Sequence, residues 1–153
     1  MRAVLKPNYV FRAMVDADLD AIMEIEPHIY SHPWTRGNFV DSLKSAHSAW
    51  VLVQDSQIIG YALTMMVLDE AHLLNLSISK KYQKQGLGRL LLEHMIYVAR
   101  TLSATNMFLE VRASNISAIA LYENIGFNEM AVRRGYYPAQ NGREDAILMG
   151  LAI

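Results

Sequence analysis

The pattern of hydrophobic and polar residues predicts a strand and then a helix at the start of the chain. Residues 9–14 are rich in side chains favoured in strands. Residues 19–26 carry apolar side chains at helical spacing, and Asp16 precedes them as a candidate N-cap. Pro27 and Pro33 follow, and we expect them to interrupt the helical pattern, because proline lacks the N–H that continues a helix.

The next segments predict a second helix and three strands. Thr35 can cap a short helix. Residues 49–54 and 58–68 are strand-like and flank a turn at residues 55–56, which is typical of a hairpin. Residues 72–79 predict a further strand. Its alternation predicts one face with Leu74, Leu76 and Ile78 and the other with Leu73, Asn75 and Ser77.

The second half of the chain is predicted to contain two helices and three strands. Apolar residues recur at helical spacing over residues 87–102, which indicates an amphipathic helix. A strand at 107–111, a helix at 115–126 that ends on a glycine, and closing strands at 127–133 and 146–151 complete the pattern. The predicted order is β-α-α-β-β-β-α-β-α-β-β, which is an α+β fold.

Composition and charge narrow the class of protein to which this chain can belong. No repeat or Pro/Gly-rich linker divides the chain, so we expect residues 1–153 to form a single domain. A content of 52% hydrophobic and 19% charged residues indicates a packed core. The formal net charge of −1 argues against general nucleic-acid binding, which needs a basic patch. No apolar run approaches the about 20 residues that span a bilayer.

Cysteine and histidine usage excludes some chemistry. The chain has no cysteine, so disulfides, a thiolate nucleophile and cysteine-ligated zinc are excluded. His28 and His32 are four residues apart, as in helical zinc sites, but Pro27 and Pro33 disfavour such a helix and we expect no metal. Residues 1–8 lack the apolar core of a signal peptide, so we expect a cytoplasmic protein.

A glycine-bearing turn precedes the long helix. Gly86 and Gly88 lie between a predicted strand and that helix, where backbone N–H groups can bind a phosphate. Lys84 and Arg89 add positive charge. A dinucleotide fingerprint needs a glycine where Leu91 stands, and a P-loop needs lysine where Arg89 stands. A capping turn without a ligand remains an equal alternative on these residues alone.

Seven short segments, one of which contains this turn, carry a resemblance to a known family. They are Gln-x-x-Gly-x-Gly at 83–88, Leu-Glu-Val-Arg-Ala-Ser-Asn at 109–115, Ala-Ile-Ala-Leu-Tyr-Glu at 118–123, Gly-Phe at 126–127, Arg-Arg-Gly-Tyr-Tyr-Pro at 133–138, Gly-Arg-Glu-Asp-Ala at 142–146 and Pro-Trp at 33–34. The set resembles the GCN5-related N-acetyltransferase (GNAT) superfamily, in its ribosomal-protein alanine N-acetyltransferase (RimI) branch. The segment Asn-Leu-Ser-Ile at 75–78 and Lys84 depart slightly from the family pattern.

The resemblance implies a fold and a cosubstrate. The fold is a mixed, mostly antiparallel sheet with splayed central strands flanked by helices. The cosubstrate is acetyl-CoA, with no metal. The residues that the resemblance places on acetyl-CoA are Leu76, Ser77, Ile78, Lys84, Gln85, Gly86, Leu87, Gly88, Arg89 and Asn115.

Two residues carry the proton transfers that the reaction requires. A free α-amine has a pKa of roughly 7.7–8.0 and is partly protonated at neutral pH, so a base must remove a proton before it attacks a thioester. The resemblance makes Glu110 the general base and Tyr122 the general acid for the departing thiolate. The alternatives are an ion pair of Glu110 with Arg112 or Arg143, and ordinary core packing for Tyr122.

Three aromatic residues are candidates for binding the acceptor, the molecule that receives the acetyl group. Tyr136 and Tyr137, expected in the loop between the last two strands, would bind the acceptor peptide, with Trp34 on the opposite wall. The resemblance implies transfer to the N-terminal alanine of a small-subunit ribosomal protein. We expect the enzyme to be a monomer. The alternatives are acetylation of a small amine, such as a polyamine or aminoglycoside, and a non-catalytic acyl-CoA sensor.

Overall fold

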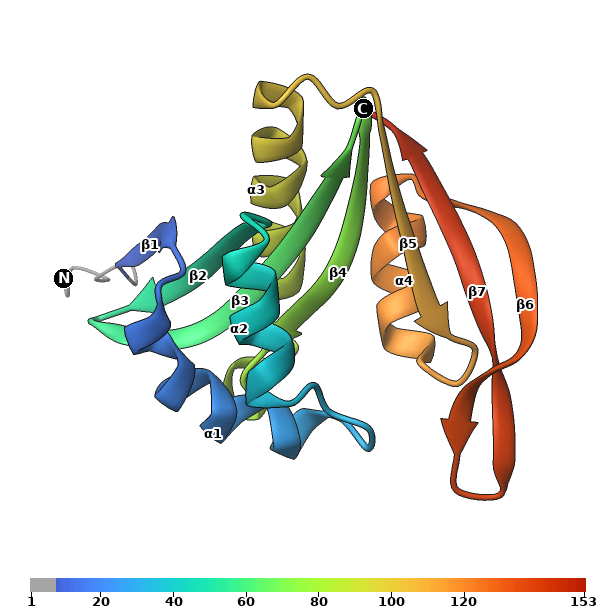
Figure 1. Ribbon diagram of the computed structural model, residues 1–153, viewed down its shortest axis with the longest axis horizontal. Coiled ribbons are helices and arrows are strands. Elements are labelled where there is room, and N and C mark those ends of the chain that lie inside the picture. The colour runs from blue at the N-terminus through green and yellow to red at the C-terminus, as the bar shows by residue number, and fades with distance from the viewer. Residues whose placement is uncertain (1–7) are drawn as a thin grey trace, which may run out of the picture.

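The computed structural model describes residues 8–153, whose centre is a sheet in the order β1-β2-β3-β4-β5-β7-β6 (Figure 1). Residues 1–7 lie outside the described part. The prediction that residues 1–8 contain no signal peptide therefore falls almost entirely on residues that the structure does not describe. The strands are β1 (Tyr9–Ala13), β2 (Ser48–Gln54), β3 (Gln57–Val67), β4 (Glu70–Ile78), β5 (Asn106–Arg112), β6 (Asn128–Ala139) and β7 (Gly142–Ala152). The helices are α1 (Leu19–Ile29), α2 (Arg36–Lys44), α3 (Leu87–Thr101) and α4 (Ile116–Ile125), with 3₁₀ turns at Asp16–Asp18 and Lys80–Tyr82. The predicted α+β order is confirmed.

Helices cover both faces of the sheet. Helices α1 and α2 lie on one face, and α3 and α4 lie on the other (Figure 1). Each face has its own hydrophobic cluster: Leu91, Leu92 and Met95 of α3 pack on one side, and Leu19, Ile22 and Phe39 on the other. No helix formed by residues 8–153 is both long and apolar enough to cross a membrane.

The centre of the sheet splays, as the family resemblance implies. Strands β4 and β5 run parallel and pair only from Glu70–Asn106 to Leu73–Leu109. Beyond that point β4 continues to Ile78 and β5 to Arg112, and the two strands diverge into a V-shaped opening (Figure 1). The other neighbouring strands of the sheet pair antiparallel. The splay therefore exposes one edge of β4 in the middle of the molecule.

A β-bulge changes which side chains of β4 share a face. The register with β3 shifts between Leu63, opposite Asn75, and Thr64, opposite Leu73, so Leu74 has no direct partner. Leu73 packs in the cluster beneath α3, and Leu74 packs in the cluster beneath α1 and α2. The predicted face assignment of Leu73 and Leu74 is wrong, because an extra residue in a strand reverses the alternation on either side of it.

Helix α1 differs from its prediction at both ends. It begins at Leu19 after a 3₁₀ turn, so Asp16 is not its N-cap. It also runs through Pro27 to Ile29, so the expected interruption at Pro27 is wrong. The helix ends two residues later, so the loss of the proline N–H removes one hydrogen bond in the last turn only. The predicted cap of α2 is confirmed: Thr35 Oγ1 accepts a 3.2 Å bond from the Asn38 N–H.

The last two strands form a longer hairpin than predicted. Pairing continues to Tyr137–Glu144, Pro138–Arg143 and Ala139–Gly142. Tyr136 and Tyr137 therefore lie in β6 itself, and the prediction of a loop there is wrong. Pro138 suggests a strand end by sequence, but β6 is an edge strand, where proline is tolerated because no ladder bond needs its N–H.

Candidate active site

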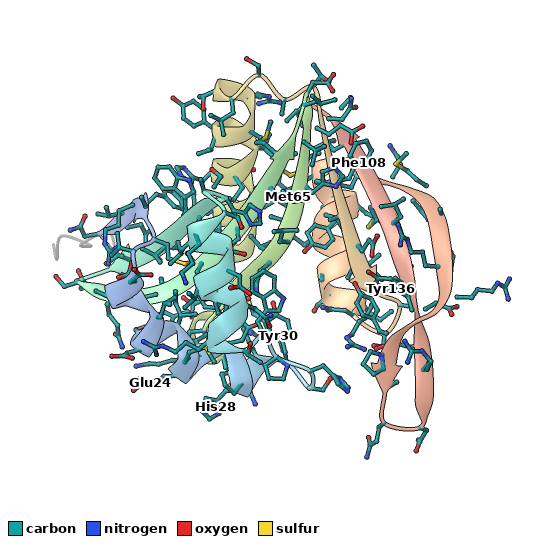
Figure 2. The ribbon with its side chains drawn as sticks, viewed as in Figure 1. Glu24, His28, Tyr30, Met65, Phe108 and Tyr136 are labelled. Atoms are coloured by element: carbon teal, nitrogen blue, oxygen red, sulfur yellow. The ribbon has the colours of Figure 1, made fainter. Side chains whose placement is uncertain are left out.

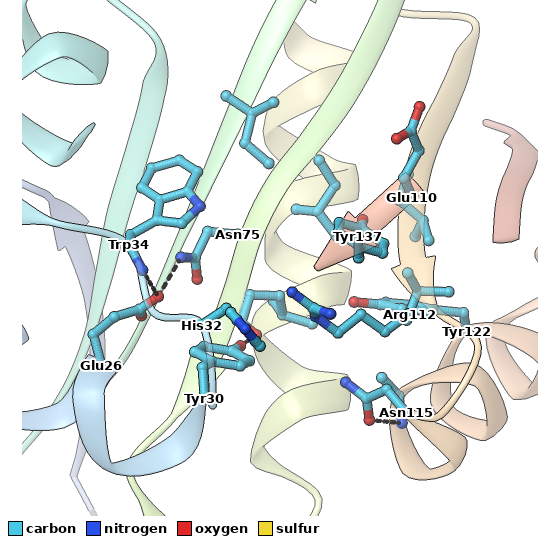
Figure 3. A pocket seen from close by; sticks show the side chains of 16 residues that line it. Glu26, Tyr30, His32, Trp34, Asn75, Glu110, Arg112, Asn115, Tyr122 and Tyr137 are labelled. Carbon is cyan, nitrogen blue, oxygen red and sulfur yellow. Dashed lines mark hydrogen bonds between the residues drawn. The ribbon is translucent and has the colours of Figure 1, made fainter. Parts of the chain in front are cut away.

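A cavity of about 200 Å³ lies at the opening between β4 and β5 (Figure 3). Its walls come from the α1–α2 connection, β4, β5, α4 and the β6–β7 hairpin. Among its lining residues are Glu26, Tyr30, His32, Trp34, Asn75, Leu76, Glu110, Arg112, Asn115, Tyr122 and Tyr137. The structure thus brings six of the sequence-predicted site residues together around one space: Trp34, Leu76, Glu110, Asn115, Tyr122 and Tyr137.

Glu110 lies on β5 just past the point where the strands separate. Its side chain is 25% exposed, and Oε1 is 3.3 Å from Nε of Arg133. Arg112 pairs instead with Glu144, and Arg143 donates to the carbonyl oxygens of the hairpin. The alternative that Glu110 pairs with Arg112 or Arg143 is therefore wrong; its partner is the half-exposed Arg133.

Glu110 also borders a second cavity, of about 530 Å³. Tyr136 and Tyr137 both line this second cavity, but only Tyr137 also lines the first. Their rings contact edge to face, with centroids 5.0 Å apart. Both cavities are lined by Leu73, Leu74, Leu109, Glu110 and Tyr137, so Glu110 belongs to the wall that they share.

Tyr122 projects into the first cavity from α4, opposite β4 (Figure 3). It is 8% exposed, and its ring packs against Phe127 at 5.7 Å between centroids. Burial raises the pKa of the Tyr122 phenol well above its usual value. The hydroxyl therefore remains protonated at neutral pH and can donate a proton or a hydrogen bond.

The N-terminus of α3 presents unpaired backbone donors. The first bond of the helix runs from the Leu90 N–H to the Gly86 carbonyl, so the N–H groups of residues 87–89 precede the helical ladder. Gly86 has φ 81°, which favours glycine, and no atom lies within 4 Å of the position of a Cβ there. At Gly88 a Cβ would lie 3.3 Å from Leu121 Cδ2 of α4. The turn is open towards solvent at Gly86 and closed by packing at Gly88.

The remaining predicted residues of this turn differ in their surroundings. Leu87 is buried in the core beneath α3. Gln85 Nε2 donates a long 3.5 Å bond to the Lys81 carbonyl. Arg89 forms an exposed ion pair with Glu93 at 2.9 Å, so part of its charge is already compensated. Lys84 has a positive φ of 62° and exposes its side chain beside the turn.

The open edge of β4 offers backbone groups to the cavity. The Ser79 N–H bonds to Ile59 on β3, and bonding directions alternate along a strand, so the groups of Leu76 and Ile78 point to the open edge. Their carbonyls are already bonded, by Tyr30 Oη at 2.9 Å and by Gln83 Nε2 at 3.0 Å. This arrangement leaves the N–H groups of Leu76 and Ile78 as donors. Ser77 is instead turned into the interior, where it is 2% exposed.

Asn115 combines a structural bond with a place at the cavity. Its Oδ1 accepts a 3.2 Å bond from the Ala118 N–H and so caps α4, as predicted. The side-chain amide N–H₂ lies at the cavity wall (Figure 3). Asn115 can therefore cap the helix with its oxygen and donate to a ligand with its nitrogen.

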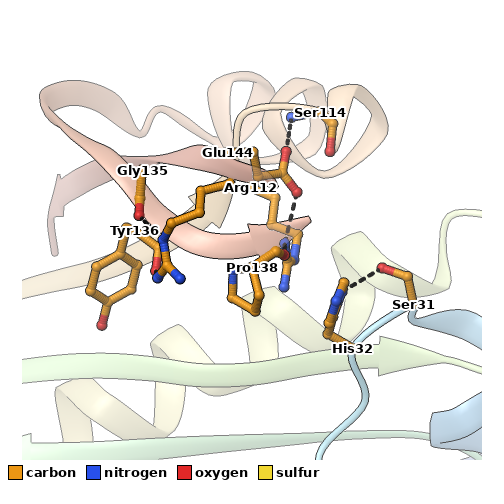
Figure 4. Close-up of polar contacts among 9 residues, drawn as sticks. Ser31, His32, Arg112, Ser114, Gly135, Tyr136, Pro138 and Glu144 are labelled. Carbon is orange, nitrogen blue, oxygen red and sulfur yellow. Dashed lines mark hydrogen bonds and ion pairs between the residues drawn. The ribbon is translucent and has the colours of Figure 1, made fainter. Parts of the chain in front are cut away.

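Arg112 of β5 is hydrogen-bonded to the β6–β7 hairpin, which carries Tyr137 (Figure 4). Its Nη1 donates 2.8 Å bonds to Glu144 Oε1 and to the Pro138 carbonyl, and its guanidinium lies 4.4 Å from the centre of the Tyr137 ring. The bond from Arg112 lowers the pKa of Glu144. Burial, together with the nearby charge of Glu110, raises the pKa of Tyr137 to about 12. The orientation of Tyr137 thus depends on Arg112, which the sequence analysis considered only as a partner of Glu110.

Sequence reasoning also missed Glu26, Tyr30 and Asn75. Leu19, Ile22 and Glu26 form the buried stripe of α1, so a carboxylate at an apolar position was the available signal. Tyr30 points towards the centre of the molecule, whereas His28 lies on the outer side of α1 (Figure 2). His32 lines the cavity and His28 does not, and residues 8–153 contain no cluster of three or more metal-ligating side chains.

A splayed sheet that holds a carboxylate and a phenol beside the open N-terminus of a helix is the architecture of an acyltransferase. The chain belongs to the acetyltransferase (GNAT) family, whose model matches residues 19–127. It is 46% identical over 136 residues to the [ribosomal protein bS18]-alanine N-acetyltransferase of Escherichia coli K12, which covers 89% of this chain and 92% of that protein. The corresponding enzyme of Haemophilus ducreyi is 32% identical over 94% of this chain and all of that protein.

Solved structures agree with this assignment. The crystal structure of the ribosomal-protein-S18-alanine N-acetyltransferase from Escherichia coli superposes with a TM-score of 0.90 at 42% identity, over 95% of this chain and 94% of that one. Arabidopsis thaliana NAA60 in complex with a bisubstrate analogue has a TM-score of 0.86 at 20% identity, over 95% and 98% of the chains, which shows the shared fold.

Proposed function

We propose that the chain is an acetyl-CoA-dependent N-terminal acetyltransferase whose acceptor is the N-terminal alanine of ribosomal protein bS18. The observation that carries the proposal is the single cavity that joins Glu110, Tyr122 and the open edge of β4, in a chain 46% identical to an enzyme named for that acceptor. An aromatic wall of Trp34 and Tyr137 faces the same space, which suits a peptide more than a small polyamine.

The residues fit the donor that the family uses. The N–H groups of residues 87–89 and the positive end of the α3 dipole would hold the diphosphate, with Lys84 and Arg89 beside it. Leu76 and Ile78 would pair with the amides of the donor arm along the open edge of β4. Asn115 would donate from its side-chain amide. Acetyl-CoA supplies the acetyl group as a thioester, whose carbonyl carbon is open to attack by an amine.

Side chains and backbone groups of the protein then transfer the protons and stabilise the developing negative charge. Glu110 takes one proton from the acceptor amine, directly or through a water, as the nitrogen bonds to the acyl carbon. The N–H groups of the β4 edge donate to the oxygen that gains negative charge. Tyr122 gives its proton to the departing sulfur as the carbon–sulfur bond breaks. The transfer is direct within a ternary complex, so it requires no covalent bond to the enzyme.

An acetylation assay with purified protein tests the proposal. A peptide with the N-terminal sequence of bS18 is offered with acetyl-CoA, alone and in competition with spermidine and an aminoglycoside. The expected result is one acetyl group on the terminal amine of the peptide, located by tandem mass spectrometry. Preferred acetylation of either small amine would overturn the protein acceptor and support the alternative class. Transfer to neither class of amine would favour the acyl-CoA sensor.

The enzyme is further proposed to act as a cytoplasmic monomer that binds no nucleic acid directly. The net charge of −1 disfavours general nucleic-acid binding, and a chain without cysteine suits the reducing cytoplasm. Light scattering coupled to size exclusion should give a mass near 17.3 kDa. A mass of twice that value would contradict the monomer without affecting the activity.

A further inference from the structure

The wall of the cavity opposite Glu110 contains a second carboxylate. Glu26 lies on α1 and is 1% exposed to solvent, yet it lines the cavity across from Glu110 and Tyr122 (Figure 3). Within residues 8–153, no lysine, arginine or histidine nitrogen lies within 4.0 Å of its oxygens. A buried charge without a counter-charge is costly, because it loses hydration and gains no ion pair.

The hydrogen bonds of Glu26 favour its ionised form. Oε1 accepts 3.2 Å bonds from the Trp34 N–H and from Asn75 Nδ2, and Oε2 accepts a bond from the Tyr61 hydroxyl. A protonated carboxyl would have to give up one of these bonds and find an acceptor. Burial raises the pKa of Glu26, while the three bonds act in the opposite direction. A carboxylate has about four acceptor sites, so three donors leave one free.

The network around Glu26 keeps this carboxylate in place at the acceptor side. Asn75 Oδ1 accepts a bond from Ser77, whose hydroxyl lies 2.8 Å from Tyr30 Oη, another residue of the cavity wall. The Trp34 N–H belongs to the α1–α2 connection, whose indole lines the same cavity. The network therefore holds the carboxyl group of Glu26 in a fixed position at the cavity wall.

We propose that Glu26 is the counter-charge that recognises the protonated α-amine of the acceptor. The ammonium group then releases one proton to water, and Glu110 takes a second proton as the carbon–nitrogen bond forms. This inference rests on the proposed function, because it assigns a further role in the binding of the same acceptor terminus. The ammonium group supplies the positive charge that Glu26 lacks, and the low dielectric of the cavity strengthens their attraction. Glu26 then acts in binding and Glu110 in chemistry, from opposite walls of one cavity.

The test compares two peptides that differ only in the charge of the terminus. One begins with alanine; the other begins with the lactic-acid analogue, in which a neutral hydroxyl replaces the amine. Calorimetry measures the binding of each to the enzyme saturated with CoA, which cannot transfer an acetyl group. Wild-type enzyme should bind the amine peptide more tightly, and Glu26→Gln should reduce that preference about tenfold. An unchanged preference in Glu26→Gln would overturn the proposal.

Glu26→Gln is a sharp test because the amide can keep the hydrogen bonds. Its oxygen can accept from Trp34 and Asn75, and its N–H₂ can donate to the Tyr61 oxygen. Asp18→Asn is the matched control: Asp18 is also buried but pairs with Arg12 at 2.8 Å and lies outside the cavity lining. It should lower stability and leave the preference for the amine peptide unchanged. A loss of preference in both variants would overturn the specific role of Glu26.

Two further measurements keep the inference separate from folding and from the proposed function. If Glu26→Gln does not fold, Tyr61→Phe is measured instead: it removes a donor that favours the ionised form of Glu26, so as the pH is lowered the preference for the amine peptide should disappear at a higher pH than in wild type. The same pH dependence in both proteins would overturn the inference. Acetylation of the alanine peptide by wild-type enzyme tests the proposed function independently. An active wild-type enzyme whose preference survives in Glu26→Gln would refute the inference alone.

Discussion

The guanidinium Nη1 of Arg112 lies 2.8 Å from Oε1 of Glu144, and this ion pair joins the end of β5 to the β6–β7 hairpin. Both side chains are about four-fifths buried, which makes the pair stronger than an exposed one. The same guanidinium lies over the ring of Tyr137. Arg112 therefore adds a side-chain link between β5, which carries Glu110, and the hairpin that carries Tyr137.

Arg112→Ala should weaken acceptor binding more than catalysis. The loss of the contact with Tyr137 removes a cation–π interaction of about 1 kcal/mol, which corresponds to a rise in KM for the peptide of about fivefold. The value of kcat should change by less than about threefold, because Glu110 and Tyr122 do not bond to Arg112. Steady-state kinetics measures both. Arg36→Ala, which breaks the exposed pair with Asp20, is the control and should alter neither constant.

Glu110→Gln should reduce kcat by about 10² to 10⁴ while the dissociation constant of acetyl-CoA stays the same. Glutamine has the size of glutamate and can still accept a bond from Arg133, but it cannot accept a proton. Single-turnover kinetics and calorimetry separate the two effects. Glu24→Gln, on the outer side of α1 (Figure 2), should have normal turnover. Full activity of Glu110→Gln would rule out Glu110 as the base.

Tyr122→Phe should reduce kcat by about 10², because the departing sulfur loses its proton donor. The pKa of Tyr122 is raised, so the phenol keeps its proton beyond its ordinary pKa of about 10. Turnover of the wild-type enzyme should therefore show no decline from phenol ionisation between about pH 8 and pH 10. A pH profile of kcat with a basic limb in that range, absent from Tyr122→Phe, would refute this. Tyr97→Phe, exposed on α3, is the control.

Gly60→Ala should lower the free energy of unfolding by about 1–3 kcal/mol. A Cβ at this position in β3 would lie 2.9 Å from the Ser77 carbonyl oxygen and 2.7 Å from Ile78 Cδ1, and the backbone atom cannot move without disturbing β4. Gly37→Ala in α2 meets only Thr35 Oγ1 at 3.6 Å and should stabilise the protein by about 0.5 kcal/mol, because alanine favours a helix. Urea denaturation measures both variants. Equal effects would contradict the packing argument.

His94 should make the protein less stable in acid. Its ring stacks on Phe11 at 4.1 Å and meets Trp50 at 4.6 Å, and its Nε2 has no hydrogen-bond partner among the described residues. Burial lowers the pKa of His94 in the folded state. The unfolded chain therefore binds the proton more readily, and the free energy of unfolding falls as pH drops below about 6.5, until it passes the lower folded pKa.

His94→Phe tests this dependence. Phenylalanine keeps the aromatic contacts but does not titrate, so the loss of stability between about pH 7.5 and pH 5.5 should be smaller than in wild type. Guanidinium denaturation at both pH values measures the difference. His28→Gln, on the outer side of α1 (Figure 2), should follow the wild-type curve. If His94→Phe lost as much stability between these pH values as the wild type, the acid sensitivity would belong to other groups.

Local patterns determined the order of elements and several of their ends. Thr35 and Asn115 cap helices as predicted, and Gly86 and Gly126 have the positive φ angles that their positions require. These features depend on a few neighbouring residues and on backbone sterics, so the sequence alone determines them. The glycine-bearing turn was predicted from local residues as a possible phosphate site, with a capping turn as an equal alternative. The roles of Glu110 and Tyr122 were predicted from a resemblance that spans nearly the whole chain.

Tertiary structure decided how distant residues meet. Glu26 and Asn75 are separated by 49 positions, and Arg112 and Glu144 by 32, yet each pair forms a direct bond. The bulge at Leu74 and the extension of β6 through Tyr137 depend on the strands beside them, so no pattern within either segment predicts them. The spacing of α1 places Glu26 on its apolar stripe, but the sequence does not show what surrounds the carboxylate, because its hydrogen-bond donors belong to other elements that only folding brings within reach.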